Sequence, residues 1–395
     1  MNTYSIDIYD LLVRALGGND NRRLQGYLDE VIALKYNNLD IPGFSFAPDM
    51  QLDFTYEQLQ KEVGLNVMAQ YVDLDSPAIP LGGEGFQLGT GKIPRMKLVE
   101  YFNEDKVRKQ MILEQRFGTG NDRVINSAKD KLFVTLDKLI GGHTNSLTYQ
   151  RHQVVSKGKF TLTNTNNPNG IIDQTFAAHI PASNIIPLAG SKRWYTSVTD
   201  GVYGTPGADC DPIKDLKAIA RKAKDKGVRG HFELDEAYAE QVVDHPKIQE
   251  AIALRLYPLS TGDALVAAKA AVGQLTAEEK LAELGKIVGV PFKTIDSIVS
   301  VEKWDNTFKK LVRPTFRAFE DNVLVFVPDG SLGEILTVEP ISMGGTYGSF
   351  YGGRLLLTVD VDFSKKCQSF ETEMTSLVVP DKPQYMWYIH PYAAS

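Results

Sequence analysis

The chain has few cysteines: Cys210 and Cys367 are the only two in 395 residues. This number excludes a disulfide framework as the main source of stability, and we expect two free thiols in a reducing compartment. The sequence also lacks any run of about 18 apolar residues, so no membrane-spanning helix is expected. The first ten residues, MNTYSIDIYD, carry acidic residues where a signal peptide needs a basic region. We therefore expect the protein to be made and kept in a cytoplasm.

An excess of basic charge is missing as well. The 43 basic and 49 acidic residues give a net charge of −6, whereas proteins that grip nucleic acid without sequence preference usually present a basic face. We expect a protein that can lie near DNA without holding it. The composition, with 43% hydrophobic and 23% charged residues, is that of a folded chain with a substantial core.

The first 50 residues read as a helical arm rather than as a domain. Residues 5–16 have the spacing of an amphipathic helix that Gly17-Gly18 ends, and 21–35 predict a second helix. The apolar face of the first helix consists of Ile6, Tyr9, Leu12 and Val13. This surface is too small to fold alone, so the arm should lie along another surface.

A glycine-rich segment follows. Residues 71–75 look extended and MKLVEYFNE (96–104) alternates as a strand, while the glycines and prolines of 76–94 exclude a helix. We expect a long hairpin or loop with a glycine-rich tip that needs a neighbouring surface. The candidate contact residues of this tip are Gly82, Gly83, Glu84, Gly85, Phe86, Gln87, Gly89, Gly91 and Lys92.

The remaining pattern predicts an α+β chain with a helix-rich middle and a β-rich tail. A helix is expected at 104–118 and another at 122–140, which Gly141-Gly142 interrupt before the pattern partly resumes. An asparagine-rich turn predicts a hairpin between 159–163 and 171–176. Further helices are expected at 212–226, 234–242, 246–256, 263–272 and 276–287, and strands around 228–234, 292–301, 323–327, 334–338, 354–363, 368–379 and 385–390.

The sequence contains no complete nucleotide-binding, metal-binding or catalytic motif. Gly91-Lys92 is followed by Ile93, so the phosphate-binding loop pattern fails, and the dinucleotide pattern fails at Leu88. The histidines and cysteines lack metal-binding spacing. We therefore predict no catalytic residue, no cofactor and no metal. The helix 212–226 has six basic and two acidic residues, and we interpret its charge as a solvated face. A phosphate-binding face, or a face that meets an acidic patch on a neighbouring subunit, is the alternative.

The order of these segments resembles the major capsid protein of tailed phages, of the lambda E type with the Hong Kong 97-like fold. The resemblance spans nearly the whole chain. Its segments are VDLDSPAIPLGGEGFQLGTGKIPRMKLVEYFNED (72–105), the helix at 122–140, GKFTLTN (158–164), DPIKDL (211–216), HFELDEAYAEQVVDHPKIQEAI (231–252), VFVPDGSLGEILTVEPI (325–341) and CQSFETEMTSLVVPDKPQYMWYI (367–389).

The resemblance implies five parts. These are an N-terminal arm (1–66), an extended loop (67–104), a peripheral domain with a spine helix (105–200), an axial domain (201–340), and a return to the peripheral domain with the C-terminal strands (341–395). It implies a virion protein, assembled in the host cytoplasm as hexamers and pentamers of an icosahedral shell around packaged double-stranded DNA. The implied partners are other copies of the chain, a scaffold, a portal and decoration proteins, with no membrane and no specific DNA recognition.

Two details qualify this expectation. The sequence shows no long coiled-coil leader, so we expect any scaffold to be a separate protein. Some relatives cross-link subunits through a loop lysine, but we assign no such chemistry to Lys92 or Lys97. The alternatives are an encapsulin-like compartment shell, which shares the fold, and a cytoplasmic enzyme that uses the glycine-rich loop as a lid.

Overall fold

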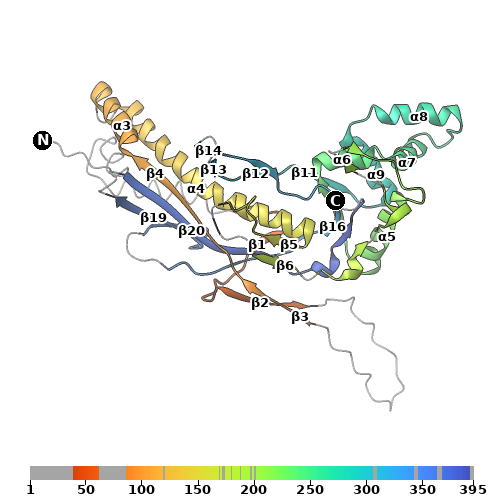
Figure 1. The fold of residues 1–395 in the computed structure, drawn as a ribbon, viewed down its shortest axis with the longest axis horizontal. Coiled ribbons are helices and arrows are strands. Elements are labelled where there is room, and N and C mark those ends of the chain that lie inside the picture. The colour runs from red at the N-terminus through yellow and green to blue at the C-terminus, as the bar shows by residue number, and fades with distance from the viewer. Residues whose placement is uncertain are drawn as a thin grey trace, which may run out of the picture. The chain divides into compact units, whose positions relative to one another are not determined.

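The chain divides into two compact units, seen in a computed structural model (Figure 1). The model describes residues 39–61, 86–118, 121–168, 170, 174–178, 180–186, 188–195, 198–199, 202–305, 309–341, 346–362 and 367–391. The first unit comprises 1–56, 92–148 and 334–378, and the second comprises 57–91, 149–333 and 379–395. The two units are defined by contacts inside one chain, whereas the five expected parts are defined by their positions in an assembled shell. The five parts therefore stay a prediction. The expected helices at 5–16 and 21–35 and the segment 71–75 lie outside the described residues.

The first unit is built on a sheet around the long strand β20 (Cys367–Pro380). β20 pairs antiparallel with β19 (Leu355–Asp362) and with all nine residues of β4 (Arg95–Asn103). The sheet continues through β17 (Gly333–Thr337) to β1 (Phe44–Phe46) on one side, and through β19 to β18 (Thr346–Phe350) on the other. Alternate residues of β19 are buried, as expected for a strand with one face on the core.

Helix α4 (Asp122–Lys157) is continuous over 36 residues and follows α3 (Glu104–Phe117). The predicted interruption at Gly141-Gly142 is therefore wrong. Each glycine costs a helix about 1 kcal/mol, but the neighbouring turns bury Leu136, Leu139 and Leu147, and full burial of one leucine contributes about 1.5–3 kcal/mol. Packing thus outweighs the local preference of the glycines.

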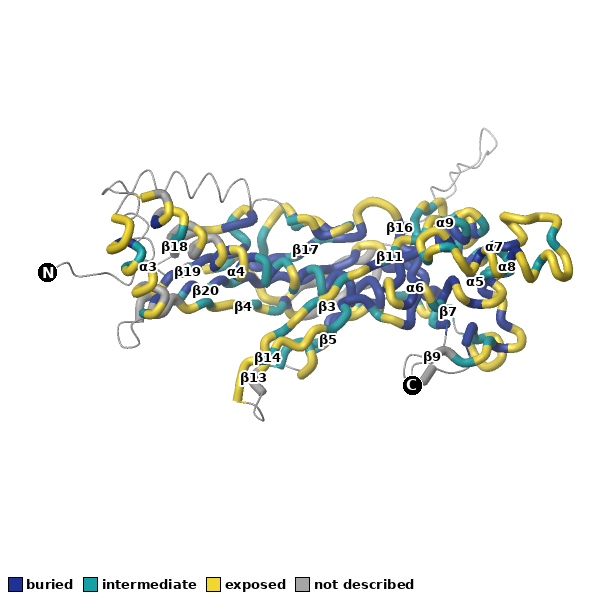
Figure 2. Tube along the Cα trace, turned by 90° about the horizontal axis from the view of Figure 1, so that it is seen from above, coloured by how far each residue is buried: buried dark blue, intermediate teal, exposed yellow. Residues whose placement is uncertain are grey.

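The second unit has a five-stranded sheet in the order β11–β10–β16–β21–β7. Its strands are β11 (Phe292–Ile295), β10 (Gly230–Asp235), β16 (Leu324–Pro328), β21 (Trp387–Ile389) and β7 (Ile185–Ile186). Its helices are α5 (Pro212–Asp225), α6 (Glu236–Val243), α7 (Pro246–Leu256), α8 (Asp263–Gly273) and α9 (Ala277–Val288). Helices and sheet share one buried apolar cluster, shown in dark blue in Figure 2, in which Phe232 stacks on Phe292 and Phe326 packs on Trp387.

The starts of α5 and α9 are those that the sequence predicts, whereas the helix expected from 234 begins at Glu236, after β10 ends. The Asp211 side chain accepts a hydrogen bond from the Lys214 backbone nitrogen at 3.0 Å, and Pro212 opens α5. Thr276 and Glu279 form the predicted capping box of α9. The helix-rich middle and β-rich tail of the expected α+β chain are confirmed.

Short elements complete the described chain. The predicted asparagine-turn hairpin is confirmed as β5 (Lys159–Thr161) paired with β6 (Thr175–Ala177). The single strand expected over 292–301 is wrong: it is β11 and a separate β12 (Ile298–Ser300), because β11 pairs with β10 whereas β12 pairs with β15 (Thr315–Arg317). The others are β8 (Val198–Thr199), β9 (Val202–Tyr203), β13 (Lys303–Asp305), β14 (Lys310–Val312) and the 3-10 turns Ala182–Asn184, Gly190–Lys192 and Pro383–Tyr385.

Candidate assembly surfaces

The glycine-rich segment contributes a strand to a two-stranded ribbon. β2 (Thr55–Lys61) pairs with β3 (Phe86–Lys92), and the two form a separate sheet (Figure 1). Of the two expected arms, 71–75 lies outside the described residues, and 96–103 belongs to β4, which pairs with β20. Alternation showed that these residues form a strand, but it carries no information on which strand becomes the partner.

The base of the ribbon is fixed to the first unit. The Ile93 backbone nitrogen donates to the Phe54 carbonyl at 2.7 Å, and Ile93 is buried. The Gln51 nitrogen donates to the Thr337 carbonyl at 2.8 Å, which ties the incoming chain to β17. β2 ends at residue 61, and its partner β3 begins at residue 86. Backbone hydrogen bonds thus fix the chain at the base of the ribbon.

The structure describes only part of the predicted contact set. Phe86, Gln87, Gly89, Gly91 and Lys92 all lie on β3. Gly82, Gly83, Glu84 and Gly85 of the tip, and Ile6, Tyr9, Leu12 and Val13 of the arm, lie outside the described residues. Lys97, on β4, forms ion pairs with Glu371 at 2.6 Å and Glu373 at 3.2 Å, and the Glu371 hydrogen bond is the main cause of its raised pKa.

An apolar surface on α7, α8 and the turn between them escaped the sequence analysis. Five large apolar side chains there are exposed: Leu254, Leu256, Tyr257, Leu259 and Val266. We call them the apolar tip. Leu259 is 95% exposed and Val266 68%. Their sequence spacing resembles that of core residues, so pattern alone could not identify them. A cluster of this kind typically marks a site of protein association.

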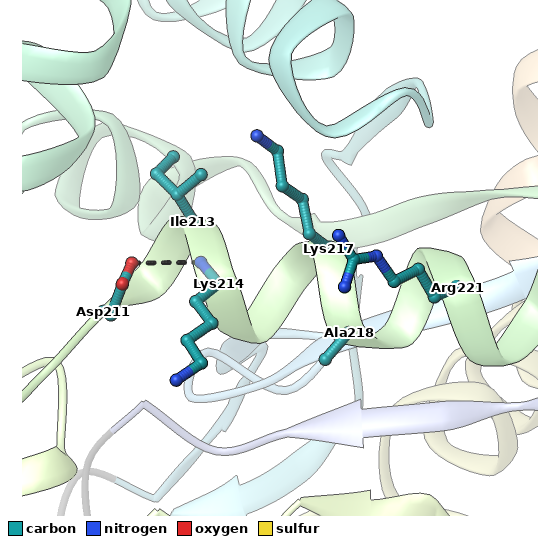
Figure 3. A pocket seen from close by; sticks show the side chains of 6 residues that line it. All are labelled: Asp211, Ile213, Lys214, Lys217, Ala218 and Arg221. Carbon is teal, nitrogen blue, oxygen red and sulfur yellow. Dashed lines mark hydrogen bonds between the residues drawn. The ribbon is translucent and has the colours of Figure 1, made fainter.

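Helix α5 carries a basic stripe. Lys214, Lys217, Arg221 and Lys224 recur at helical spacing, which places them on one face. Asp211, Ile213, Lys214, Lys217, Ala218 and Arg221 line a shallow hollow of about 360 Å³ (Figure 3). The predicted solvated face is confirmed for Lys214, Arg221 and Lys224, which are exposed.

The described residues contain one cysteine–histidine pair. Cys210 Sγ lies 3.6 Å from His245 Nε2, and both residues are buried. Burial raises the pKa of the Cys210 thiol and lowers that of His245 to about 4. Both groups are therefore neutral near pH 7, which is the opposite of an activated thiolate–imidazolium pair.

Among the described residues, no group of three or more histidine, cysteine or acidic side chains could hold a metal ion. No helix among them is both long enough and apolar enough to cross a membrane.

Comparison with known proteins identifies the family. Residues 43–387 match the model of phage major capsid protein E. The chain belongs to this family, which confirms the resemblance drawn from the sequence together with its Hong Kong 97-like α+β fold. It is therefore a phage capsid protein and a virion component. No curated protein matches the chain.

Solved structures similar to the chain come from phages and from a compartment shell. A putative prophage capsid protein from E. coli CFT073 is 14% identical with a TM-score of 0.47 (93% of this chain and 98% of that one covered). A phage-related protein from Bordetella bronchiseptica RB50 is 14% identical with a TM-score of 0.44 (99% and 98%). An encapsulin from Synechococcus elongatus PCC 7942 is 9% identical with a TM-score of 0.33 (89% and 88%). All three scores lie below 0.5, so the assignment, and the preference for a phage capsid over an encapsulin, rest on the family match.

Proposed function

We propose that the chain assembles as hexamers and pentamers into an icosahedral shell around packaged double-stranded DNA. In this proposal the extended loop (67–104) reaches over an adjacent subunit and the arm (1–66) lies along a neighbour. The axial domain (201–340) faces the capsomer centre, and 105–200 with 341–395 forms the peripheral domain. The family match supports a capsid role, and the ribbon supports this use of the loop.

The ribbon is the observation that carries the proposal. A two-stranded sheet has marginal stability in water by itself, yet β2 and β3 form such a sheet on a fixed base. A second surface is needed to order it, and in a repetitive assembly that surface is another copy of the chain. Many weak contacts of this kind sum across a closed shell and still allow wrong additions to dissociate.

Shortening the loop tests this role. Because β2 ends at residue 61 and its partner β3 begins at residue 86, a four-residue glycine–serine turn can replace residues 62–85 without changing the residues of β2, β3 or the base. We expect a soluble subunit with unchanged thermal melting that forms no closed shells in negative-stain electron microscopy. The matched control replaces 62–85 with a glycine–serine segment of the same length, which separates the reach of the loop from its specific contacts. Normal shells from the shortened chain would contradict the assigned loop role.

The partners beyond the chain itself follow from the same proposal. A separate scaffold, a portal and decoration proteins would join the shell, which would assemble in the host cytoplasm. The net charge of −6 supports an inner wall that does not trap the DNA. Co-expression with the neighbouring phage genes, followed by mass spectrometry of purified shells, would identify these partners.

A further inference from the structure

The basic stripe of α5 contains two like charges one helical turn apart. Lys217 and Arg221 are four residues apart on α5, and neither forms an ion pair with another described residue. Like charges at this spacing repel each other and weaken an isolated helix slightly. Some other basic residues of this unit are paired, for example Lys269 with Glu250 at 2.7 Å. Figure 3 shows Lys217 and Arg221 leaving α5 on neighbouring turns.

Helix α6 has the opposite arrangement. Glu236 and Glu240 are also four residues apart, both are exposed, and neither pairs with another described side chain. The inward face of α6 buries Tyr238, Ala239 and Val242 in the core, so this acidic stripe faces away from it. Both stripes thus combine charge with the same local repulsion; Arg221, Glu236 and Glu240 are exposed, and Lys217 is half-buried.

The two stripes match in spacing. Four residues of helix span about 6 Å, so Lys217 with Arg221 and Glu236 with Glu240 can form two ion pairs at once when the helices lie side by side. Within one subunit no ion pair joins the two stripes among the described residues, although α5 and α6 both pack against α7 and α9. A contact between two different surfaces of identical subunits is head-to-tail, and such contacts form a ring when the rotation from one subunit to the next closes.

We propose that the basic stripe of α5 binds the acidic stripe of α6 on the next copy of the chain. This inference rests on the proposed function and specifies one contact that would hold a capsomer ring together. The occupant of the α5 face is then a protein carboxylate pair rather than a nucleic acid phosphate. Because exposed ion pairs are screened by salt, this contact should weaken as ionic strength rises.

A charge exchange tests the contact. Lys217→Glu with Arg221→Glu, and separately Glu236→Lys with Glu240→Lys, should each raise the subunit concentration needed for assembly about fivefold or more, by replacing attraction with repulsion. The four substitutions together should restore assembly to near the wild-type concentration. Arg221→Glu alone should have a larger effect than Lys222→Glu, which alters an exposed lysine beside the stripe. Light scattering and sedimentation measure assembly, and thermal melting of each subunit checks folding.

The outcomes are distinct. If both double variants fail to assemble and the chain with all four substitutions fails as well, the pairing is wrong. Normal assembly of every variant would also overturn it. If the α5 variant alone forms normal shells that lack packaged DNA, the basic stripe binds nucleic acid instead. That result would also overturn the proposed pairing. A wild-type chain that forms small rings but no shell would count against the proposed function and not against the pairing. In that case, restoration of the rings by the four substitutions together would still support the pairing. A wild type that stays monomeric would overturn both.

Discussion

At the scale of single residues, the carboxylate of Glu233 is a buried charge with two partners. It accepts a hydrogen bond from Arg151 at 2.6 Å, and the exposed fractions of the two side chains are 1% and 2%. His231 lies 3.3 Å away and also reaches Asp329 at 3.0 Å. Although burial acts to raise the pKa of Glu233, these partners lower it to about 2. The carboxylate is therefore charged at neutral pH, and His231 and Arg151 together stabilise that charge.

Replacing Arg151 with methionine should destabilise the subunit by about 3–5 kcal/mol, because Glu233 would keep a buried charge without one of its two partners. Lys157→Met is the matched control, since Lys157 pairs with Glu320 at 2.6 Å on the surface of the same helix. An exposed pair of this kind contributes less than about 1 kcal/mol. Urea unfolding measures both variants, and equal losses would contradict the special role of the buried pair.

The buried histidines predict acid sensitivity. Burial lowers the pKa of His143, His152 and His245 to about 4, against 6.5 in the unfolded chain. Between these values the unfolded chain binds more protons, so stability falls as the pH drops from 6.5 to 4. His143→Gln should reduce that slope by about 1.4 kcal/mol per pH unit. Urea unfolding at several pH values tests this, and an unchanged slope would contradict it.

His231 should behave in the opposite way. Its hydrogen bond to Glu233, with a second to Asp329, raises its pKa. The stability that His231 contributes is fully present below pH 6.5 and is lost as the pH rises through its raised pKa. His231→Gln should therefore flatten the stability profile above pH 6.5, while the acid slope from the buried histidines remains. Loss of the acid slope in this variant would contradict the assignment.

At the scale of elements, the two glycines inside α4 offer a matched pair. A Cβ atom added at Gly141 meets nothing within 4 Å, whereas one added at Gly142 would lie 2.3 Å from Leu98 Cδ1. Gly141→Ala should stabilise the subunit by about 1 kcal/mol through helix propensity. Gly142→Ala should gain clearly less, because the Leu98 side chain must move away. Thermal melting compares the two, and equal gains would contradict this packing.

The elements also show what the sequence can predict. The start of α5 at Asp211-Pro212 and the capping box of α9 could be predicted from the sequence, because both depend on residues within one helical turn. Pairing was harder, since β4 finds its partner β20 more than 260 residues away, and nothing in MKLVEYFNE encodes that partner. The basic stripe was visible as charge, but the apolar tip was not, because exposure of Leu259 depends on tertiary structure.

At the scale of the whole molecule, the subunit carries several surfaces that do not contribute to its own fold. The ribbon, the apolar tip and the two charged stripes belong to different elements, and each costs an isolated chain some stability or solubility. A shell would make use of all of them through repeated contacts, none of which needs to be strong. The apolar tip provides the last test, because its side chains contribute little to the fold.

Leu259→Ser with Val266→Ser should change the stability of the isolated subunit by no more than about 0.5 kcal/mol, because both side chains are exposed. If a neighbour covers the tip, burial of each side chain is worth about 1.5–3 kcal/mol. The concentration needed for assembly should then rise about tenfold or more. Leu265→Ser is the contrasting control: Leu265 packs against the core, so it should lower the melting temperature. Unimpaired assembly of the double variant would show that the apolar tip stays exposed in the shell.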